Sequence, residues 1–532
     1  MRDTASPPPS EGDVRTKWVP DRTAWLPLIL IVMVAAALRL WHLGAQSVWT
    51  DEGWGWAIAI RPALEVLTRR LDFGNPPSYY LLLGFWMRLF GDSEAMLRLP
   101  SALAGTASVV VLYLLGRDLF GQRVGLVAAA LLAFSATHIE LSQLARPYVV
   151  AGFLSLLGTW LFWRAVRTDR WPYWLGVTVV GTAAFCSHYT SALVVAVQGA
   201  YLLAAHRRAR GFLAVGAIPL LSLPCVLVHL APGIARPDGY DFWQPYFSLT
   251  HLMPLAGMLL GRPLLAGAPR LVVAVCGGLA LIAIAWPLWQ GLLRAAQEDR
   301  HSGRPALLTA GCLVLPIALL AAAARMKPIW DDVYLFGALP GYLLLAALAL
   351  ADGRGKPRVV LAASLLVLYT LALSRSHIVP RQTRSWGYEP GVFVARPSWE
   401  PRSAFEDWRG AVAATLQAAR TPGGASPIAF VGEGTLGTLQ YYSRGSLPAY
   451  ALPRDARLAE ADVAPLVARA DSVFILAPDR FPPDGWEARA RQVAQIRGPG
   501  RFRRFLGVRV FAFGKGAAAL GGIPVTAGNL GP

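Results

Sequence analysis

Residues 120–166 read FGQRVGLVAAALLAFSATHIELSQLARPYVVAGFLSLLGTWLFWRAV. Two apolar runs, 120–137 and 148–166, flank a short polar segment, and each approaches the roughly 20 residues that a helix needs to cross a bilayer. Arg146 is the single Lys or Arg between the two runs. The stretch therefore predicts two membrane-spanning helices joined by a short loop.

The same pattern extends over most of the chain. Of its 532 residues, 55% are hydrophobic and only 15% are charged, whereas average soluble proteins carry roughly 25% charged residues. The candidate spans are 24–43, 94–115, 120–137, 148–166, 172–188, 190–205, 212–230, 268–293, 305–324, 335–351 and 358–374. We therefore expect an α-helical polytopic membrane protein with about eleven transmembrane helices.

The distribution of Lys and Arg predicts how these helices are oriented. One set of loops holds 14 Lys/Arg in 41 residues, and the opposite set holds 9 in 107. The richer set comprises 116–123, 164–171, 205–211, 294–304 and 352–358. Because short cytoplasmic loops carry the excess of basic residues, we expect a plasma-membrane protein with a cytoplasmic N-terminus and an extracytoplasmic C-terminus.

Composition divides the chain into three parts. Residues 1–23 contain three consecutive prolines and mixed charges, which predicts a disordered cytoplasmic segment. Residues 24–374 form the predicted membrane domain. Residues 375–532 read like a soluble protein, and their short apolar runs, 428–431 and 473–477, suggest a small α/β domain. The basic residues behind the net charge of +18 gather in short loops between apolar runs, which favours membrane topology over a nucleic-acid partner.

The long predicted outer loop, residues 44–93, carries the first candidate for chemistry. Its stretches 56–70 and 78–90 are amphipathic, as in helices that lie along a membrane surface. Near its start, Asp51 and Glu52 are adjacent. In a partly dehydrated setting, one of two neighbouring carboxylates tends to have a raised pKa. One of the pair could then act as a general base while the other supports it by hydrogen bonding. The alternative is a solvated pair of loop carboxylates.

The second candidate is Arg146, in the short outer loop 138–147 and close to Tyr148. An arginine at the membrane edge is costly unless it is paired with an anion, and a guanidinium matches the geometry of a phosphate. A lipid-linked phosphate is one such partner. The alternative is an arginine that snorkels to a lipid headgroup.

The third candidate is the pair Pro76 and Pro77, which precedes Tyr79. The two prolines restrict the backbone and end any helix before residue 76. This predicts a rigid entry into the next helix, which is compatible with a role in shaping a site.

Metal and disulfide chemistry are not indicated. His42, His138, His188 and Glu140 are expected near the outer face, but nothing in their spacing fixes them as ligands. The four cysteines lie far apart in apolar runs, which is typical of small buried residues. We therefore expect no metal site, no cofactor and no disulfide.

Short motifs in a fixed order accompany these features. They are Leu38-Arg39-Leu40, Val48-Trp49-Thr50-Asp51-Glu52, Pro76-Pro77-x-Tyr79-Tyr80, Phe90-Gly91-Asp92-Ser93-Glu94, Leu97-Arg98-Leu99-Pro100-Ser101, Gly116-Arg117 and Ser142-Gln143-x-Ala-Arg146-x-Tyr148. Over residues 35–205 this series resembles the glycosyltransferase family 39 group, which is similar to protein O-mannosyltransferases and aminoarabinose lipid A transferases of the GT-C fold. The run Gln440-Tyr441-Tyr442 resembles the outer domain of bacterial members.

The resemblance implies a GT-C membrane domain and a defined reaction. The donor would be a sugar on a polyprenyl phosphate, and the acceptor a hydroxyl of a glycan, lipid or protein at the outer face. Transfer is expected to invert the anomeric carbon. By resemblance Asp51 is the base, Glu52 supports it and Arg146 neutralises the departing phosphate.

Further residues are expected to bind the donor phosphate or the substrate. They are Tyr148, Pro76, Pro77, Tyr79 and Glu140. The family's arginine before Tyr334 is replaced by Val333, so Lys327 or Arg325 is a candidate substitute. The sequence does not identify the sugar or the acceptor, and the alternative function is a polytopic transporter or lipid-linked sugar flippase.

Overall fold

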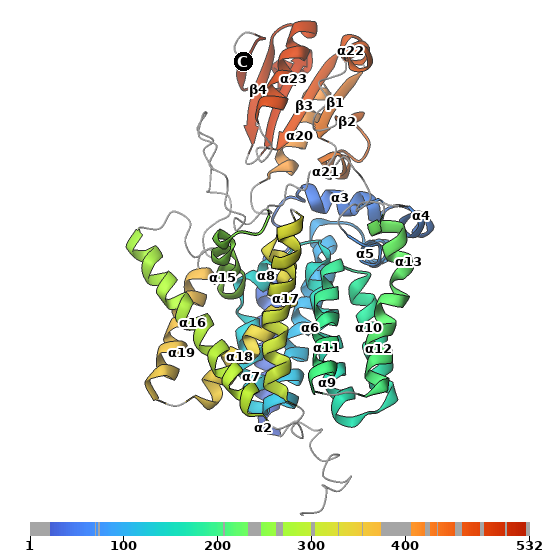
Figure 1. Cartoon of the computed structure of the whole chain (residues 1–532). Coiled ribbons are helices and arrows are strands. Elements are labelled where there is room, and N and C mark those ends of the chain that lie inside the picture. The colour runs from blue at the N-terminus through green and yellow to red at the C-terminus, as the bar shows by residue number, and fades with distance from the viewer. Residues whose placement is uncertain are drawn as a thin grey trace, which may run out of the picture.

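The computed structural model consists of a bundle of membrane helices and a small α/β domain beyond one end of it (Figure 1). It describes residues 22–69, 71–72, 75–205, 208–231, 246–261, 270–298, 304–327, 329–353, 355–373, 406–420, 426–432, 435–452, 460–478, 483–505 and 508–527. The predicted disorder of 1–23 falls almost wholly outside these residues, as does the predicted domain boundary at 375.

The long apolar runs are helices, as predicted. Six helices are long and apolar enough to cross a membrane, or seven if the bent pair α7 and α8 is one span. The helices of the bundle are α2 (Arg22–Leu40), α6 (Glu94–Phe120), α7 (Gln122–Ala133), α8 (Ala136–Ser142), α9 (Pro147–Thr168), α10 (Trp171–Phe185), α11 (Ala192–Ala205), α12 (Ala209–Leu221), α16 (Arg270–Gln297), α17 (Pro305–Met326), α18 (Leu339–Asp352) and α19 (Gly355–Leu373). Several of these are shorter than a full span, so the count of about eleven stays a prediction.

The end of the bundle away from the C-terminal domain carries a cluster of basic side chains. Asp118, at the end of α6, accepts hydrogen bonds from Arg117 at 2.9 Å and from the Trp160 indole at 3.1 Å. It also pairs with Arg164 of α9 at 3.2 Å. Nearby, Arg208, which precedes α12, pairs at 3.1 Å with Asp169, which follows α9. Basic residues of three predicted loops, Arg117, Arg164 and Arg208, are therefore held at this end of the bundle.

Three short helices lie across the other end of the bundle, below the C-terminal domain (Figure 1). They are α3 (Thr50–Ala59), α4 (Ala63–Thr68) and α5 (Ser78–Phe90). They cover the stretches predicted to be amphipathic, and α5 ends where Gly91 adopts a φ of 81°, a conformation that favours glycine. This layer separates the bundle from the C-terminal domain.

The C-terminal domain is a six-stranded mixed sheet with strand order β2-β1-β3-β5-β4-β6. β1 pairs in parallel with β2 and β3, whereas β3, β5, β4 and β6 pair antiparallel. The strands are β1 (Pro427–Gly432), β2 (Ala449–Leu452), β3 (Ser472–Pro478), β4 (Gly500–Phe505), β5 (Val508–Gly514) and β6 (Ile523–Val525). The helices are α20 (Trp408–Ala419), α21 (Leu436–Ser443), α22 (Glu460–Arg469), α23 (Pro483–Arg497) and α24 (Gly516–Leu520).

Alternation along the central strands gives this sheet two buried faces. Phe430 and Ile475 pack against Trp486 of α23, while Val431 and Phe474 join the core with Trp408 of α20. Because both faces of β1 and β3 are buried, their sequences are continuous apolar runs. They coincide with the two runs that predicted a small α/β domain.

Candidate functional site

The site is built around the first turn of α3. Asp51 and Glu52 occupy this turn, where the positive end of the helix dipole favours carboxylates. Glu52 Oε2 also accepts a hydrogen bond from the Trp49 amide at 3.3 Å. The local sequence thus places both carboxylates at a helix start that faces the end of the bundle.

Glu52 is fully buried and paired with Arg98 of α6. Arg98 Nε donates to Glu52 Oε1 at 2.9 Å, and its Nη2 donates to Oε2 at 2.7 Å. The exposed fractions of the two side chains are 3% for Arg98 and 0% for Glu52. Glu52 Oε1 also accepts from the Ala145 amide at 2.8 Å. Glu52 therefore joins α3, α6 and the segment before Arg146.

Asp51 faces Arg146, the residue that caps the start of α9. Arg146 Nη2 lies 4.0 Å from Asp51 Oδ2, and its Nη1 donates to the Asp51 carbonyl at 3.2 Å. The side chain of Arg146 is 8% exposed and that of Asp51 is 28% exposed. Arg146 Nε has no hydrogen-bond partner among the described residues. A buried guanidinium with a long ion pair and an unused donor is suited to bind a further anion.

Aromatic rings surround the guanidinium. Arg146 lies over the Tyr148 ring at 5.6 Å from its centre. His188 packs against Tyr148, Tyr334 and Phe336 with ring centres 5.4, 5.2 and 5.4 Å apart. Burial and the Arg146 charge lower the pKa of His188 to about 3. The imidazole is therefore neutral near pH 7 and forms an uncharged wall beside Arg146.

Tyr79 lies on the side of the cluster formed by α5. Its ring is 1% exposed, and burial raises the pKa of its phenol, with Arg146 close enough to oppose that rise. The next residue, Tyr80, donates a hydrogen bond to Asp72, which also accepts from the Asn75 amide at 3.1 Å. Tyr79 therefore lies near Arg146, and its substrate-binding role stays a prediction.

The predicted proline pair shapes the entry to α5. Pro77 precedes Ser78 as the helix cap, both prolines are buried, and the Ser78 amide donates to the Cys186 carbonyl at 3.1 Å. Glu140 lies half-buried in α8, and Lys327 is exposed at the end of α17. The cluster described above is built without Glu140 and Lys327, so their binding roles stay predictions.

Sequence reasoning missed two members of the site. The sequence predicts only that His188 lies near the outer face, and no motif marks Asp331. Asp331 is 1% exposed and close enough to Tyr148 and His188 to influence both. The signal in the sequence was the acidic pair 331–332 just before Tyr334, where the family's arginine is absent.

Gln143 fixes the segment that carries Arg146. Its side-chain nitrogen lies 3.2, 3.2 and 2.9 Å from the carbonyl oxygens of Leu38, Arg39 and Trp41 at the end of α2. These carbonyls have no partners within their own helix. Gln143 therefore stabilises the end of α2 and the start of the Arg146 segment at once.

Comparisons with known proteins identify relatives of the chain and of its fold. The family described as dolichyl-phosphate-mannose-protein mannosyltransferase matches residues 74–234. An undecaprenyl phosphate-alpha-4-amino-4-deoxy-L-arabinose arabinosyl transferase of Pseudomonas paraeruginosa is 28% identical over 320 residues, which are 56% of this chain and 55% of that protein. The chain thus spans about half the length of the curated relatives that it matches.

Solved structures share the fold over most of the chain. ArnT from Cupriavidus metallidurans, bound to undecaprenyl phosphate, superimposes with a TM-score of 0.60 at 15% identity, covering 94% of this chain and 100% of that one. The Archaeoglobus fulgidus oligosaccharyltransferase gives 0.53 at 13% identity, covering 91% and 74%. The chain is therefore an integral membrane protein of the GT-C fold, and its residues 74–234 are similar to the dolichyl-phosphate-mannose-protein mannosyltransferase family.

Proposed function

We propose that the protein transfers a sugar from a polyprenyl-phosphate donor to an acceptor hydroxyl at the outer face of the plasma membrane, with inversion. The observation that carries this proposal is the pairing of Asp51 with Arg146. One is a partly exposed carboxylate, and the other is a buried guanidinium 4.0 Å away with an unused Nε. Together they supply a proton acceptor and an anion site at the surface of a membrane bundle.

Asp51 would act as the general base. The acceptor hydroxyl gives its proton to the carboxylate as its oxygen forms a bond to the anomeric carbon. The bond from that carbon to the phosphate oxygen breaks at the same time, and the polyprenyl phosphate leaves. Attack from the face opposite the phosphate inverts the anomeric carbon.

Arg146 would bind the phosphate before and after transfer. Its separation from Asp51 is at the outer limit of an ion pair, so little attraction is lost when the guanidinium turns to a phosphate. A preorganised cation in a buried setting stabilises the charge that develops on the leaving group. His188, neutral because of its lowered pKa, adds no second positive charge and instead packs beside the site.

The site is proposed to face the outside of the cell. Arg117, Arg164 and Arg208 lie at the end of the bundle opposite to α3, and the excess of basic residues in cytoplasmic loops supports a cytoplasmic location for that end. The membrane domain, 24–374, would hold the reaction centre, and the domain 375–532 would lie outside. A relative's name specifies aminoarabinose and the matching family's description specifies mannose, so both sugars are suitable test donors.

Transfer from defined donors tests the proposal. The purified protein in nanodiscs would receive undecaprenyl-phosphate- or dolichyl-phosphate-linked sugars with an extract of envelope glycans and lipids, and release of polyprenyl phosphate would be measured. We expect release with the unaltered protein and a loss of roughly a hundredfold or more in Asp51→Asn. Full activity of Asp51→Asn would exclude Asp51 as the base. Movement of intact donor across the bilayer without release would favour a flippase.

Variants of Arg146 test the phosphate site separately. Arg146→Ala should weaken binding of undecaprenyl phosphate, and Arg146→Lys should recover only part of it because a lysine lacks the bidentate fork. Arg61→Ala is the matched control. Its side chain lies in the other outer loop, 44–93, is 46% exposed and pairs with Glu65. Equal binding by Arg146→Ala and Arg61→Ala would contradict the assignment.

A further inference from the structure

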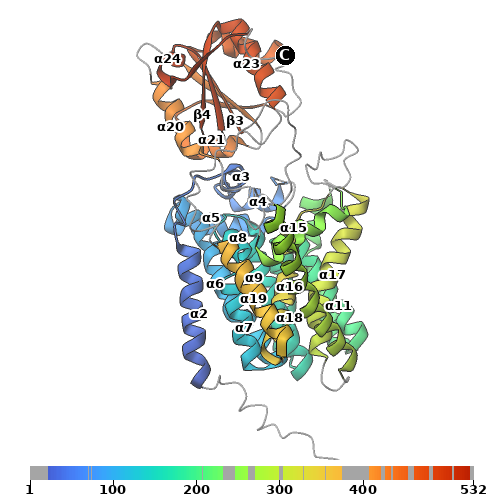
Figure 2. The same ribbon diagram turned by 90° about the vertical axis from the view of Figure 1, so that its left-hand side faces the viewer.

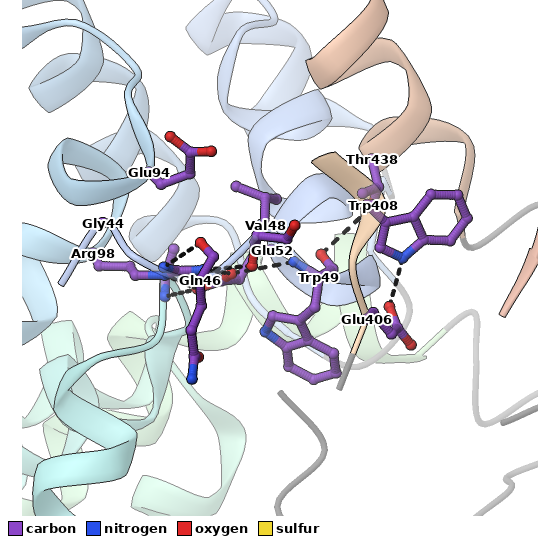
Figure 3. A network of polar contacts seen from close by, with 12 residues as sticks. Gly44, Gln46, Val48, Trp49, Glu52, Glu94, Arg98, Glu406, Trp408 and Thr438 are labelled. Carbon is purple, nitrogen blue, oxygen red and sulfur yellow. Dashed lines mark hydrogen bonds and ion pairs between the residues drawn. The ribbon is translucent and has the colours of Figure 1, made fainter. Parts of the chain in front are cut away.

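The C-terminal domain contacts the first turn of α3 through a buried carboxylate. Glu406 Oε2 accepts a hydrogen bond from the Thr50 amide at 3.2 Å and from the Thr50 hydroxyl at 2.9 Å. The Trp408 indole donates to the same oxygen at 2.7 Å, and Glu406 is 8% exposed. Figure 3 shows Glu406 and Trp408 beside this turn. A buried carboxylate needs such donors to remain charged, so the contact has a defined geometry.

A second contact brings the two backbones close together at the same turn. The Thr438 hydroxyl of α21 lies 3.4 Å from the carbonyl oxygens of Trp49 and Thr50. A Cβ added at Gly53 would lie 2.5 Å from the Thr438 Cα, and one added at Gly437 would lie 2.4 Å from the Gly53 oxygen. Glycine at both positions is what allows α3 and α21 to approach so closely.

Asp51 therefore lies between two neighbours that are fixed from opposite directions. Thr50 is bound by Glu406 of the C-terminal domain, and Glu52 is bound by Arg98 of the bundle. Asp51 itself contacts Arg146 and is the most exposed of the three. The direction of its carboxylate depends on both contacts, because a short turn cannot rotate at one residue while its neighbours stay in place.

We propose that Glu406 is a positioning residue for Asp51, so that the C-terminal domain completes the reaction centre rather than only covering it. The inference rests on the proposed function for the role of Asp51. A displacement of about 1 Å in a reacting group can reduce the rate by roughly a hundredfold. Loss of the Glu406 contact should therefore lower kcat while leaving the donor site around Arg146 intact.

The test compares Glu406→Ala with Asp407→Ala in the full-length protein. Asp407 is the neighbouring carboxylate and accepts only from Gly410 of its own helix at 2.8 Å among the contacts described. We expect Glu406→Ala to lower kcat by about tenfold to a hundredfold, with the KM for the donor changed less than about threefold and undecaprenyl phosphate bound as before. Asp407→Ala should keep kcat. Unaltered kcat in Glu406→Ala, or equal losses in both variants, would overturn the proposal.

Thr50 provides a milder variant in case Glu406→Ala does not fold. Thr50→Val removes the hydroxyl donor with little change of shape and should lower kcat, whereas Thr50→Ser should recover most of the loss. In the double variant with Glu406→Ala, the loss should approach that of Glu406→Ala alone, because the two residues share one contact. Multiplicative losses, or a fully active Thr50→Val, would contradict the coupling.

The outcome also separates this inference from the proposed function. If Asp51→Asn is inactive and Glu406→Ala is fully active, the positioning role is wrong and the base assignment stands. If Asp51→Asn is active, the base assignment is wrong. In that case a selective loss of kcat in Glu406→Ala would point to another group on the same turn.

Discussion

Two adjacent residues of the same chemical type have different surroundings in this protein. Glu52 is buried between Arg98 and the Ala145 amide. Asp51 is partly exposed, and its carboxylate lies 4.0 Å from Arg146, which is a long distance for an ion pair. A carboxylate whose hydrogen-bonding capacity is used within the protein holds structure. The partly exposed Asp51 is the carboxylate that we propose accepts the proton of the acceptor hydroxyl. At the residue scale, the hydrogen-bonding partners of the two carboxylates distinguish their roles, because their chemical type is the same.

Glu52→Gln should therefore damage stability more than Asp51→Asn does. The amide leaves the Arg98 guanidinium buried without its counter-charge, which costs about 3 kcal/mol or more. We expect a clear fall in the apparent Tm of the purified protein for Glu52→Gln, and a change of at most a few degrees for Asp51→Asn. Glu65→Gln, in the exposed pair with Arg61, is the control. A Tm for Glu52→Gln that matches the control would show that the pair is not structural.

At the element scale, the packing of α3 against α21 determines how the C-terminal domain meets the membrane bundle. Polar contacts surround this packing. The Tyr442 hydroxyl accepts from the Val48 amide at 2.6 Å, and Arg409 pairs with Glu94 at 2.8 Å. The ring of Trp56 meets that of Tyr441 edge to face at 5.4 Å. The contact thus combines close backbone approach with directional bonds, so that one orientation is favoured.

Gly437→Ala should disrupt this packing. The added methyl would lie 2.4 Å from the Gly53 oxygen and 2.8 Å from its carbonyl carbon, and backbone cannot move away without displacing α3. We expect faster hydrogen exchange in both α3 and α21 and a loss of transfer activity. Gly216→Ala in α12, where a new Cβ meets nothing within 4 Å, is the matched control. Unchanged exchange in Gly437→Ala would mean that the two helices are not in close contact.

At the scale of the whole molecule, the contact between the two domains includes a charge pair whose strength depends on pH. Asp92, at the end of the long loop, binds Arg444 at 2.5 Å and accepts from the Trp56 indole at 2.9 Å. Burial would raise the pKa of Asp92, but the bonds from Arg444 and Trp56 outweigh it and hold the pKa below its ordinary value of 3.8. A lowered pKa means that this contribution to stability is present above pH 3.8 and is lost as the pH falls through the lower, folded-state pKa.

Acid should therefore weaken the contact between the domains in a way that depends on Asp92. Below about pH 3.8, we expect the unaltered protein to lose protection from exchange in α21 as the pH falls. Asp92→Asn should show the weaker contact at neutral pH and less change on acidification. The measurement is hydrogen exchange corrected for intrinsic rates across this range. An identical pH profile in both proteins would remove Asp92 from the contact.

The shape of the molecule also makes a topological prediction. α2 begins at the end of the bundle away from the C-terminal domain (Figure 2), and Arg117, Arg164 and Arg208 of three basic loops lie at that same end. We therefore expect a reporter that is active only outside the cytoplasm to function when fused after residue 532. The matched fusion within 205–211 should be inactive. A C-terminal reporter active only in the cytoplasm would reverse the proposed sidedness.

The sequence by itself determined the local elements. The apolar runs became the helices of the bundle, the amphipathic stretches became α3, α4 and α5, and the two runs of the C-terminal domain became β1 and β3. These features depend on the length and period of apolar residues, which act over one or two dozen positions. The number of membrane spans does not follow from this pattern alone, because helices packed within the bundle, such as Tyr189–Ala205, need not reach full membrane length.

Only the tertiary structure decided which side chains meet. The order of motifs marked Asp51, Glu52 and Arg146. It did not show that Arg98 pairs with Glu52, or that Arg146 pairs with Asp51. Nor did it show that Glu406 binds Thr50, 356 positions away along the chain. Such contacts depend on how whole helices pack and on where small residues allow backbones to approach. The sequence around a carboxylate does not identify its hydrogen-bonding partner. Its role is therefore defined only when the fold brings that partner within hydrogen-bonding distance.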